Sequence, residues 1–410
     1  MHLRVCMGSD DVGAESGEAV RMAGLRKSRW AAMAIAAAGL SGVSGTPSAR
    51  AAQPVLQAEQ STVATLPTMS SHWFLPATGS ESYTLYNGDT AQILGTLPGD
   101  LISNAAFSPD GKTFYVAVTM WARGDHGPRE DFLRAYDAHT LALVKEIELP
   151  PRALAVYKIQ NMDLSQDGHW AYIFDMSPAT GITVIDLKAG KVVRTVDTPG
   201  CALVFPWKSG GLSSLCGDGS LTNVAVDASG AAKVSHVAPF FDANNDPVFE
   251  QSPIDRHAGI AFFITYTGKV FETSLGATPT IGTPWTLSAA AGQPVATTGV
   301  QDVAWRPGGK EPFAYQRATR QLYALMHMGT YWTHKREGNE IWVYDTTAHT
   351  LLRRIALPAD CVGIAVSQDQ HPLLYALTGE GKAFVMDAAS GKVLHTIDAR
   401  IGGIALTPDL

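Results

Sequence analysis

The sequence is poor in the features that mark nucleic-acid-binding, membrane-spanning and disordered proteins. Only 17% of its 410 residues are charged, and the formal net charge is −7, whereas proteins that bind nucleic acids through phosphate contacts are normally basic. Outside the N-terminus, no apolar run approaches the roughly 18 residues that a membrane helix needs. With 46% hydrophobic residues the chain is too apolar for global disorder. We therefore expect a folded protein that binds no nucleic acid and does not span a membrane.

Sequence motifs for familiar chemistry are also absent. The chain contains no CxxC pair, no HExxH, no Walker sequence, and no GxGxxG that follows a strand and opens a helix. Met326, His327 and Met328, followed by His334, resemble a set of copper ligands, but seven residues across a loop fix no coordination geometry. We therefore predict no catalytic residues and no metal site in this chain.

The N-terminal segment, residues 1–51, is typical of a secretory signal peptide. Three basic residues lie within residues 26–29, a short alanine-rich apolar segment covers residues 30–40, and residues 49–51 form a small-x-small cleavage site. The acidic residues that precede Met22 are unusual in a signal peptide, so we interpret Met22 as the biological start. The alternative is a disordered tail in a cytosolic protein. Export predicts a periplasmic location.

The four cysteines agree with export. Cys6 lies in the predicted signal segment. Cys201 and Cys216 flank the turn-like segment 206–211, a spacing that predicts a hairpin or loop-closing disulfide in an oxidising compartment. Two buried free thiols are the alternative. Cys361 has no obvious partner, and we expect a free thiol in the core.

A repeat runs through the rest of the chain. Apolar strands end in an acidic or amide residue, a turn follows, and a second apolar strand begins, which is the pattern of a β-hairpin. For example, Asp137 precedes the apolar segment 141–149, and Asp387 precedes segment 392–397. The marker positions are Asn87, Asp137, Asp186, Asp227, Glu272, Asp345 and Asp387. They recur about every 50 residues and define seven units.

A second marker, Ser-x-Asp, occurs upstream in three units, at residues 108–111, 165–168 and 367–369. Each copy separates an apolar strand from one that is rich in aromatic and β-branched residues. The flanking strands are predicted at residues 105–107, 114–118, 162–164, 170–174, 363–366 and 373–377. Each unit thus offers about four short strands, and a period of 40–50 residues with four strands is typical of a β-propeller blade.

We therefore predict an all-β fold, a seven-bladed β-propeller over residues 71–410, preceded by an N-terminal arm at residues 52–70. Residues 401–406 copy the first strand of a unit, so we expect the C-terminal strand to join the N-terminal blade and close the ring, which leaves no free sheet edge. The long gap between Glu272 and Asp345 requires an insertion, which segments 276–300 and 328–339 can supply. A pair of β-sandwiches or an open repeat is the alternative.

Two loops between predicted strands are elaborated. Thr333, His334 and Lys335 lie in a polar loop with aromatic neighbours, and we predict that this loop contacts a partner protein. Residues 121–131 form a second, charged insertion; such loops on a rigid scaffold commonly carry contacts. The alternative for each is a solvated loop.

Several segments together are similar to the heavy subunit of the quinoprotein amine dehydrogenases, the methylamine and aromatic-amine dehydrogenase family. The similar stretches are residues 201–206, 215–221, 266–269, 305–309, 333–335, 340–345, 366–369 and 372–377. Their order and spacing hold across essentially the whole predicted mature chain, and the cysteine pair with its Gly-Asp-Gly-Ser-Leu tail is the most specific piece.

The resemblance implies a periplasmic scaffold rather than a cofactor carrier. In that family two propeller chains assemble with two small, cysteine-rich light chains into a heterotetramer. The light chain holds tryptophan tryptophylquinone and the catalytic aspartate, and electrons pass to a blue-copper protein. The resemblance therefore implies that this chain oxidises no amine by itself, carries no cofactor and forms a wall of the substrate channel.

One channel residue follows from the resemblance. The family places an aromatic residue at the start of the second unit, and the matching position here is Leu101. A leucine makes the entrance wider or shifted, so methylamine, longer aliphatic amines and aromatic amines all remain possible substrates. The alternative is that Leu101 only packs in its blade.

A second function is also compatible with the sequence. A stand-alone exported propeller could bind a partner or hydrolyse a lactone. Lactonase propellers use acidic residues, and often Ca²⁺, around the central channel, so this alternative predicts an acidic ring at the inner ends of the strands.

Overall fold

The computed structural model describes residues 65–77, 82–100, 102–124, 126–152, 157–176, 179–399 and 403–410. The predicted signal peptide, most of the predicted arm, and Leu101 lie outside the described residues. In the described part of the arm, Leu66 is buried and its N–H donates to the carbonyl oxygen of His139. No helix of the described residues is long and apolar enough to cross a membrane.

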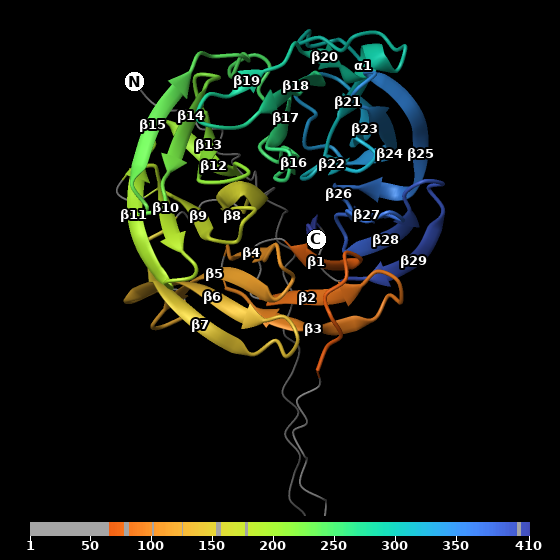
Figure 1. Cartoon of the computed structure of the whole chain (residues 1–410). Helices are drawn as coiled ribbons and strands as arrows, with labels where there is room; N and C mark the ends of the chain where they lie inside the picture. Colours follow the sequence, from red (N-terminus) through yellow and green to blue (C-terminus); the bar gives the residue numbers. More distant parts are fainter. Residues whose placement is uncertain are drawn as a thin grey trace, which may run out of the picture. The chain divides into compact units, whose positions relative to one another are not determined.

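Seven antiparallel sheets, counted over the described residues, stand around a central axis like the blades of a propeller (Figure 1). From the axis outward, the first blade contains β30 (Ile404–Leu406), β1 (Trp73–Ala77), β2 (Ser82–Asn87) and β3 (Ile93–Pro98). The second contains β4 (Asn104–Phe107), β5 (Thr113–Trp121), β6 (Arg129–Asp137) and β7 (Leu143–Leu149). The third contains β8 (Met162–Leu164), β9 (Trp170–Asp175), β10 (Gly181–Asp186) and β11 (Lys191–Asp197).

The remaining blades follow the same order. The fourth contains β12 (Cys201–Pro206), β13 (Gly211–Cys216), β14 (Leu221–Val226) and β15 (Ala232–Val237). The fifth contains β16 (Ile254–Asp255), β17 (Ile260–Ile264), β18 (Lys269–Ser274), β19 (Thr280–Ile281) and β20 (Trp285–Thr286). The sixth contains β21 (Ala304–Pro307), β22 (Phe313–Gln316), β23 (Gln321–Gly329), β24 (Gly338–Asp345) and β25 (Thr350–Cys361). The seventh contains β26 (Gly363–Val366), β27 (Leu373–Leu377), β28 (Lys382–Asp387) and β29 (Val393–Asp398).

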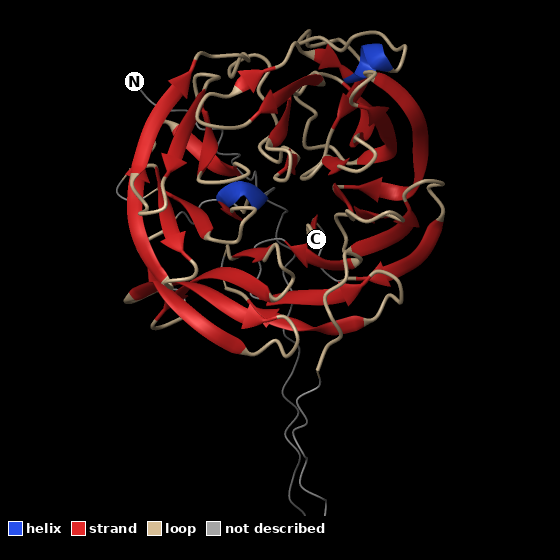
Figure 2. Cartoon of the chain, in the orientation of Figure 1, coloured by secondary structure: helices blue, strands red, loops and turns tan. Residues whose placement is uncertain are grey.

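The prediction of a seven-bladed propeller is confirmed, and so is its closure. The C-terminal strand β30 pairs antiparallel with β1, with Leu406 opposite Leu75, so the last strand completes the first blade. The only helical segments among the described residues are the turn η1 (Ile159–Asn161) and the short α1 (Leu287–Ala290) (Figure 2).

The repeat markers correspond to fixed positions in the blades. Most of the seven lie where the third strand ends, and their side chains cap the following turn; Asp137, for example, accepts hydrogen bonds from the N–H groups of His139 and Thr140. Glu272 differs because it lies inside β18, which continues to Ser274 to pair with β19. Three of the strands predicted around the Ser-x-Asp turns, namely β8, β26 and β27, coincide with the observed ones.

Aromatic side chains join neighbouring blades. Phe74 of the first blade contacts Tyr375 of the seventh, with 4.6 Å between ring centroids, and Phe205 of the fourth contacts Phe263 of the fifth at 5.1 Å. These four side chains are almost completely buried. Burial of such large apolar side chains between sheets is the main stabilising contribution to the ring.

The strand directions give the ring two different faces. The turn face carries the hairpin turns between the first and second strands, except in the first blade where β30 and β1 come from the two ends of the ring, and those between the third and fourth strands. The loop face carries the connections between the second and third strands and those between blades. Both elaborated loops predicted from sequence are on the loop face, at residues 122–128 between β5 and β6 and residues 330–337 between β23 and β24. The predicted insertion contains β19, β20 and α1.

Candidate partner-binding face and central channel

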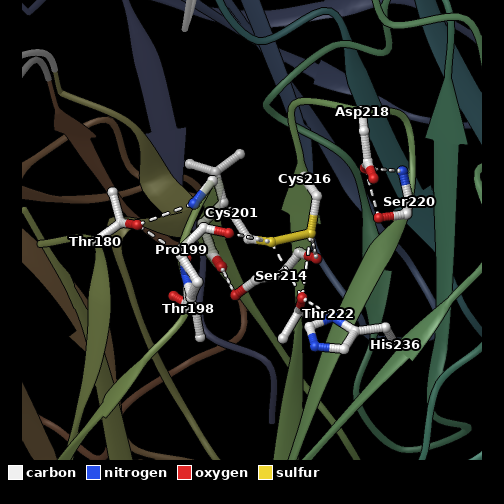
Figure 3. Close-up of a disulfide and its surroundings, with 12 residues drawn as sticks. Thr180, Thr198, Pro199, Cys201, Ser214, Cys216, Asp218, Ser220, Thr222 and His236 are labelled. Carbon is white, nitrogen blue, oxygen red and sulfur yellow. Dashed lines mark hydrogen bonds between the residues drawn. A yellow bond between two sulfur atoms is a disulfide. The ribbon is translucent and has the colours of Figure 1, made fainter. Parts of the chain in front are cut away.

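The disulfide is the first predicted feature on the loop face. Cys201 begins β12 and Cys216 ends β13, and the two residues are opposite each other in the hairpin. They form a disulfide with 3.9 Å between their Cα atoms (Figure 3). The bond therefore ties the inner two strands of the fourth blade together at the loop face. Cys361 is a free, buried cysteine, as expected.

A polar chain connects this disulfide with the outer edge of its blade. The Thr222 hydroxyl lies 3.1 Å and 3.3 Å from the two sulfur atoms, and 2.8 Å from Nδ1 of His236 (Figure 3). Disulfide sulfurs can only accept hydrogen bonds, so any hydrogen bond between this hydroxyl and a sulfur atom is donated by the hydroxyl. Thr222 thus lies between the disulfide and His236 on the outer strand of the blade.

A buried arginine contacts Ile102, just before β4. Arg152 follows β7 and is only 4% exposed; its Nη1 donates to the carbonyl oxygen of Ile102 at 2.9 Å. Ile102 has a φ of 52°, which is unfavourable for a β-branched residue unless its surroundings hold it. The hydrogen bond from Arg152 supplies such a restraint next to Leu101.

Arg152 belongs to a buried ionic network. Asp131 on β6 accepts hydrogen bonds from Arg129 at 2.7 Å and from the Thr119 hydroxyl at 2.5 Å, and it lies 3.5 Å from Nε of Arg152. Burial lowers the pKa of Arg152 to about 10, although the charge of Asp131 opposes the shift. Arg152 therefore stays protonated at neutral pH, and the aspartate compensates for its buried charge.

His327 holds the β23–β24 loop through a hydrogen bond to Thr333. This histidine on β23 is 3% exposed, and its Nε2 lies 2.7 Å from the Thr333 hydroxyl, which donates to the carbonyl oxygen of Thr330. Because the hydroxyl proton is already used, Nε2–H of His327 is the donor. Burial lowers the pKa of His327 to about 4, and the nearby charge of Arg336 adds to the shift, so the ring is neutral at pH 7.

His334 lies flat on an aromatic neighbour. Its ring stacks on Tyr266 with 3.8 Å between centroids and an interplanar angle of 12°, and Phe249 contacts it edge-on. Burial lowers the pKa of His334 to about 4, with a further contribution from the charge of Lys335. The histidine is thus a neutral part of an aromatic cluster. Thr333 and His334 are half-buried rather than exposed, and of the three predicted contact residues only Lys335 is exposed.

Trp332 presents an aromatic surface at the edge of this cluster. Its side chain is 50% exposed, its φ is 68°, and its ring contacts Tyr331 and Tyr266. Other large apolar side chains exposed on this blade and its insertion are Val295, Val300, Val303, Met328 and Leu352. A half-exposed tryptophan held by neighbouring rings is the kind of side chain that contributes most to protein interfaces.

Buried Arg306 attaches the insertion to the sixth blade. Its guanidinium group donates to the carbonyl oxygens of Thr297 at 2.7 Å, Asp302 at 3.1 Å and Gly329 at 3.2 Å, and it lies over the ring of Tyr331. Arg306 therefore ties Thr297 and Asp302 to Gly329 at the end of β23. Sequence reasoning missed both Arg306 and Arg152, because an isolated arginine in the sequence does not show that it is buried or which carbonyl oxygens it contacts.

The central channel is the second candidate site. A cavity of about 180 Å³ is lined by residues of six innermost strands, β4, β8, β16, β22, β26 and β30. The acidic residues in its wall are Asp163, Asp255, Glu311 and Asp409, and the basic ones are Arg256 and Arg317. No group of three His, Cys, Asp or Glu side chains among the described residues is placed to hold a metal ion.

The last residues of the sequence, up to Asp409, line this cavity, and the C-terminus lies near the ring axis (Figure 1). Arg256 forms ion pairs with Asp163 and Asp409, and Arg317 pairs with Asp409 and donates to the carbonyl oxygen of Leu410 at 2.6 Å. Burial lowers the pKa of Arg256, but the charges of Asp163 and Asp409 outweigh burial and raise it. The acids at this end are therefore neutralised by arginines, unlike the free acidic ring that a lactonase-like site requires.

Comparison with known proteins covers nearly the whole ring. The family model of the methylamine dehydrogenase heavy chain matches residues 72–408. The methylamine dehydrogenase heavy chain of Methylophilus methylotrophus is 31% identical over 328 residues, covering 78% of this chain and 77% of its own length. That of Methylobacillus flagellatus is 28% identical over 331 residues, covering 80% and 81%.

A solved structure supports the fold alone. The dihydro-heme d1 dehydrogenase NirN aligns with a TM-score of 0.51 and 13% identity, over 82% of this chain. The alignment spans 63% of that solved chain. At such low identity the likeness says nothing about chemistry.

Proposed function

This chain belongs to the methylamine dehydrogenase heavy-chain family, and we propose that it is the heavy subunit of an exported amine dehydrogenase. The enzyme would oxidise primary amines to aldehyde and ammonia and pass the electrons to a blue-copper protein. The observation that carries the proposal is the match of the family model to residues 72–408, essentially the complete ring.

In this proposal the quinone belongs to a separate, cysteine-rich light chain. Tryptophan tryptophylquinone supplies the electron-accepting centre for amine oxidation and is built from two tryptophans. The ring centroids of Trp305 and Trp342 of the present chain are 5.0 Å apart. Trp342, however, is completely buried, and its Nε1–H donates to Glu340. A buried, hydrogen-bonded tryptophan cannot meet an amine, which supports placing the quinone in the partner.

The chain's own contribution would be to hold the partner and to shape the path of the amine. The cluster around Trp332, Tyr266 and His334 offers an apolar contact surface, with Lys335 exposed beside it. The network of Arg152 and Asp131 holds the connection that contains Leu101. We propose that Leu101 forms part of the entrance for substrate. The disulfide supports an oxidising compartment such as the periplasm.

Co-expression tests the proposal. The chain is produced with and without a short cysteine-rich partner encoded in the same organism, and the reduction of a redox dye by primary amines is measured. We expect activity from the complex, which we propose to contain two copies of each chain, and none from the isolated chain. Full activity of the isolated chain would refute the role of a scaffold.

A further inference from the structure

Glu311 is a buried carboxyl group in the channel wall that the proposed function does not use. It is 8% exposed, and one of its oxygens accepts a hydrogen bond from the N–H of Ala405 at 3.2 Å. Among the described residues no lysine, arginine or histidine forms an ion pair with it. Burial raises the pKa of Glu311 well above its ordinary value, and the single backbone hydrogen bond offsets this only in part. An ionised carboxylate at this position therefore lacks a compensating positive charge.

A second acceptor in the cavity wall, the side-chain oxygen of Gln160, lacks a hydrogen-bond donor. Gln160 is 7% exposed, and its amide nitrogen donates to the carbonyl oxygen of Ser252 at 3.2 Å, which fixes the orientation of the side chain. Its Oε1 has no hydrogen-bond partner, and neither has the buried hydroxyl of Tyr157, which is close enough to Glu311 to feel its charge. Buried acceptors without partners are rare in native proteins and call for a donor.

Apolar side chains form another part of the cavity wall. It includes Ala105, Phe107, Met162, Ile364 and Val366. An apolar cavity of about 150 Å³ is large enough to bind benzene. The channel, at about 180 Å³, therefore has room for a small organic molecule with a hydrocarbon part.

We propose that the central channel binds a small organic ammonium ion, whose N–H groups donate to Glu311 and Gln160 and whose hydrocarbon part lies against the apolar wall. This binding site goes beyond the proposed function, because it is in the ring itself and needs no light chain. An anionic ligand fits less well: the arginines of the cavity wall, Arg256 and Arg317, are already paired with Asp163 and Asp409.

Binding would be accompanied by release of a proton. Burial raises the pKa of Glu311 and so favours its neutral form in the empty channel, whereas the charge of a bound ammonium ion favours loss of the proton to solvent. The charge of Glu311 contributes to raising the pKa of Tyr157, which burial raises most. The other charged or titratable groups in the cavity wall are Asp163, Asp255, Tyr315, Asp409, Arg256 and Arg317. Ion pairs join four of them, Arg256 with Asp163 and Asp409, and Arg317 with Asp409.

Calorimetry on the purified full chain, without any partner, tests the site. The probe is butylammonium chloride, and the controls are butan-1-ol, which has the hydrocarbon without the charge, and tetramethylammonium chloride, which has the charge without N–H donors. Titrations in buffers with different ionisation enthalpies measure the proton release. The variants are Glu311→Gln, Gln160→Leu and the matched control Glu380→Gln, which removes an exposed carboxylate outside the cavity.

We expect saturable binding of one butylammonium ion with release of up to one proton, at least tenfold weaker binding to Glu311→Gln, and unchanged binding to Glu380→Gln. Neither control compound should bind. The absence of saturable binding to the natural chain, or equal affinity in Glu311→Gln, would overturn the proposal. If Glu311→Gln fails to fold, the comparison of the three compounds on the natural chain still shows whether binding needs both the charge and the N–H donors. Dye-reduction assays do not enter this test, so either proposal can fail independently.

Discussion

Arg152 holds a surface connection in place through buried contacts. It donates to the carbonyl oxygen of Ile102, and its charge is compensated by Asp131, which Arg129 and Thr119 also contact. The backbone at Ile102, on the loop face, is therefore restrained. In the proposed enzyme such rigidity would keep the entrance for substrate constant in width.

Replacing this arginine should destabilise the protein measurably. We expect Arg152→Met to lower the free energy of unfolding by about 3 kcal/mol, because Asp131 stays buried with less compensation and the Ile102 carbonyl loses its donor. Urea unfolding followed by tryptophan fluorescence measures the change. Arg123→Met, which removes an exposed arginine of the same face, is the control and should change stability little. Equal effects of both substitutions would contradict the network's role.

Leu101 provides a test of substrate selection at a single position. In the assembled enzyme, Leu101→Phe should narrow the entrance and lower kcat/KM for benzylamine relative to methylamine by about tenfold, the scale of a small steric change in an apolar pocket. Leu101→Ile, which conserves volume, should leave the ratio nearly unchanged. The measurement is the ratio of kcat/KM for the two amines; an unchanged ratio in Leu101→Phe would mean that this residue only packs in its blade.

At this scale the sequence predicted some site residues and missed others. The pairing of Cys201 with Cys216 could be predicted from spacing and from the intervening turn, which are local properties. Thr333 and His334 were expected in an exposed loop, but stacking on Tyr266 and the contact with His327 bury half of each. Those partners come from other strands, so no local sequence pattern predicts the contacts.

At the scale of strands and blades, ring closure depends on a cluster of contacts between the first and seventh blades. Nδ1 of His72 lies 2.7 Å from Asp89, and its Nε2 lies 3.0 Å from Asp369 of the seventh blade. Tyr375 donates to the carbonyl oxygen of His72 at 2.9 Å. Burial lowers the pKa of His72, but its hydrogen bond to Asp89 and the negative charges of Asp369 and Asp89 outweigh burial and raise it above 6.5.

This shift predicts a pH dependence of stability. A histidine whose pKa is raised by folding contributes stability that is fully present below its unfolded value of 6.5 and is lost as the pH rises through the folded value. The free energy of unfolding should therefore decline over this window. His72→Gln should flatten the decline, whereas His139→Gln, at an exposed position, should not. Urea titrations between pH 5 and pH 8, a range of about 3 units around the ordinary histidine pKa, measure the pH dependence of the free energy of unfolding. Identical pH profiles for the two variants would contradict the role of His72.

The disulfide is expected to stabilise the fourth blade. Loop-closure entropy for a 15-residue separation corresponds to about 3 kcal/mol, so Cys201→Ser with Cys216→Ser should lower the free energy of unfolding by roughly that amount. Unfolding with and without reductant provides the control: reductant should destabilise the natural chain and Cys361→Ala, but not the double variant. A natural chain that is insensitive to reductant after complete reduction would contradict this expectation.

Strand positions were predictable to a large extent, because each blade repeats one local pattern. The turn residues Asp137 and Asp387 accept hydrogen bonds from nearby N–H groups, so their spacing reports the third strand of each blade. Prediction was weakest in the fifth and sixth blades. There Glu272 is inside a strand, and β21 and β22 both pair with β23, an irregularity that depends on the insertion and not on the repeat.

At the scale of the whole molecule, the two faces of the ring differ in construction. The turn face is made of short capped hairpins and is crossed at the channel by Asp409, which Arg256 and Arg317 hold. The loop face carries the disulfide, the connection around position 101 and the cluster around Trp332. Long connections on one side of a rigid scaffold are where propellers can bind partners, and the proposed light chain would dock there.

The central claim is that this chain supports a redox centre that belongs to another chain. The most direct measurement is the intact mass of each subunit from an active, co-purified complex, by mass spectrometry under denaturing conditions. The account predicts that this chain has the mass of its processed sequence less two hydrogens for its disulfide, and that the added quinone oxygens are found in the small partner. Quinone oxygens on a tryptophan of this chain would contradict the account.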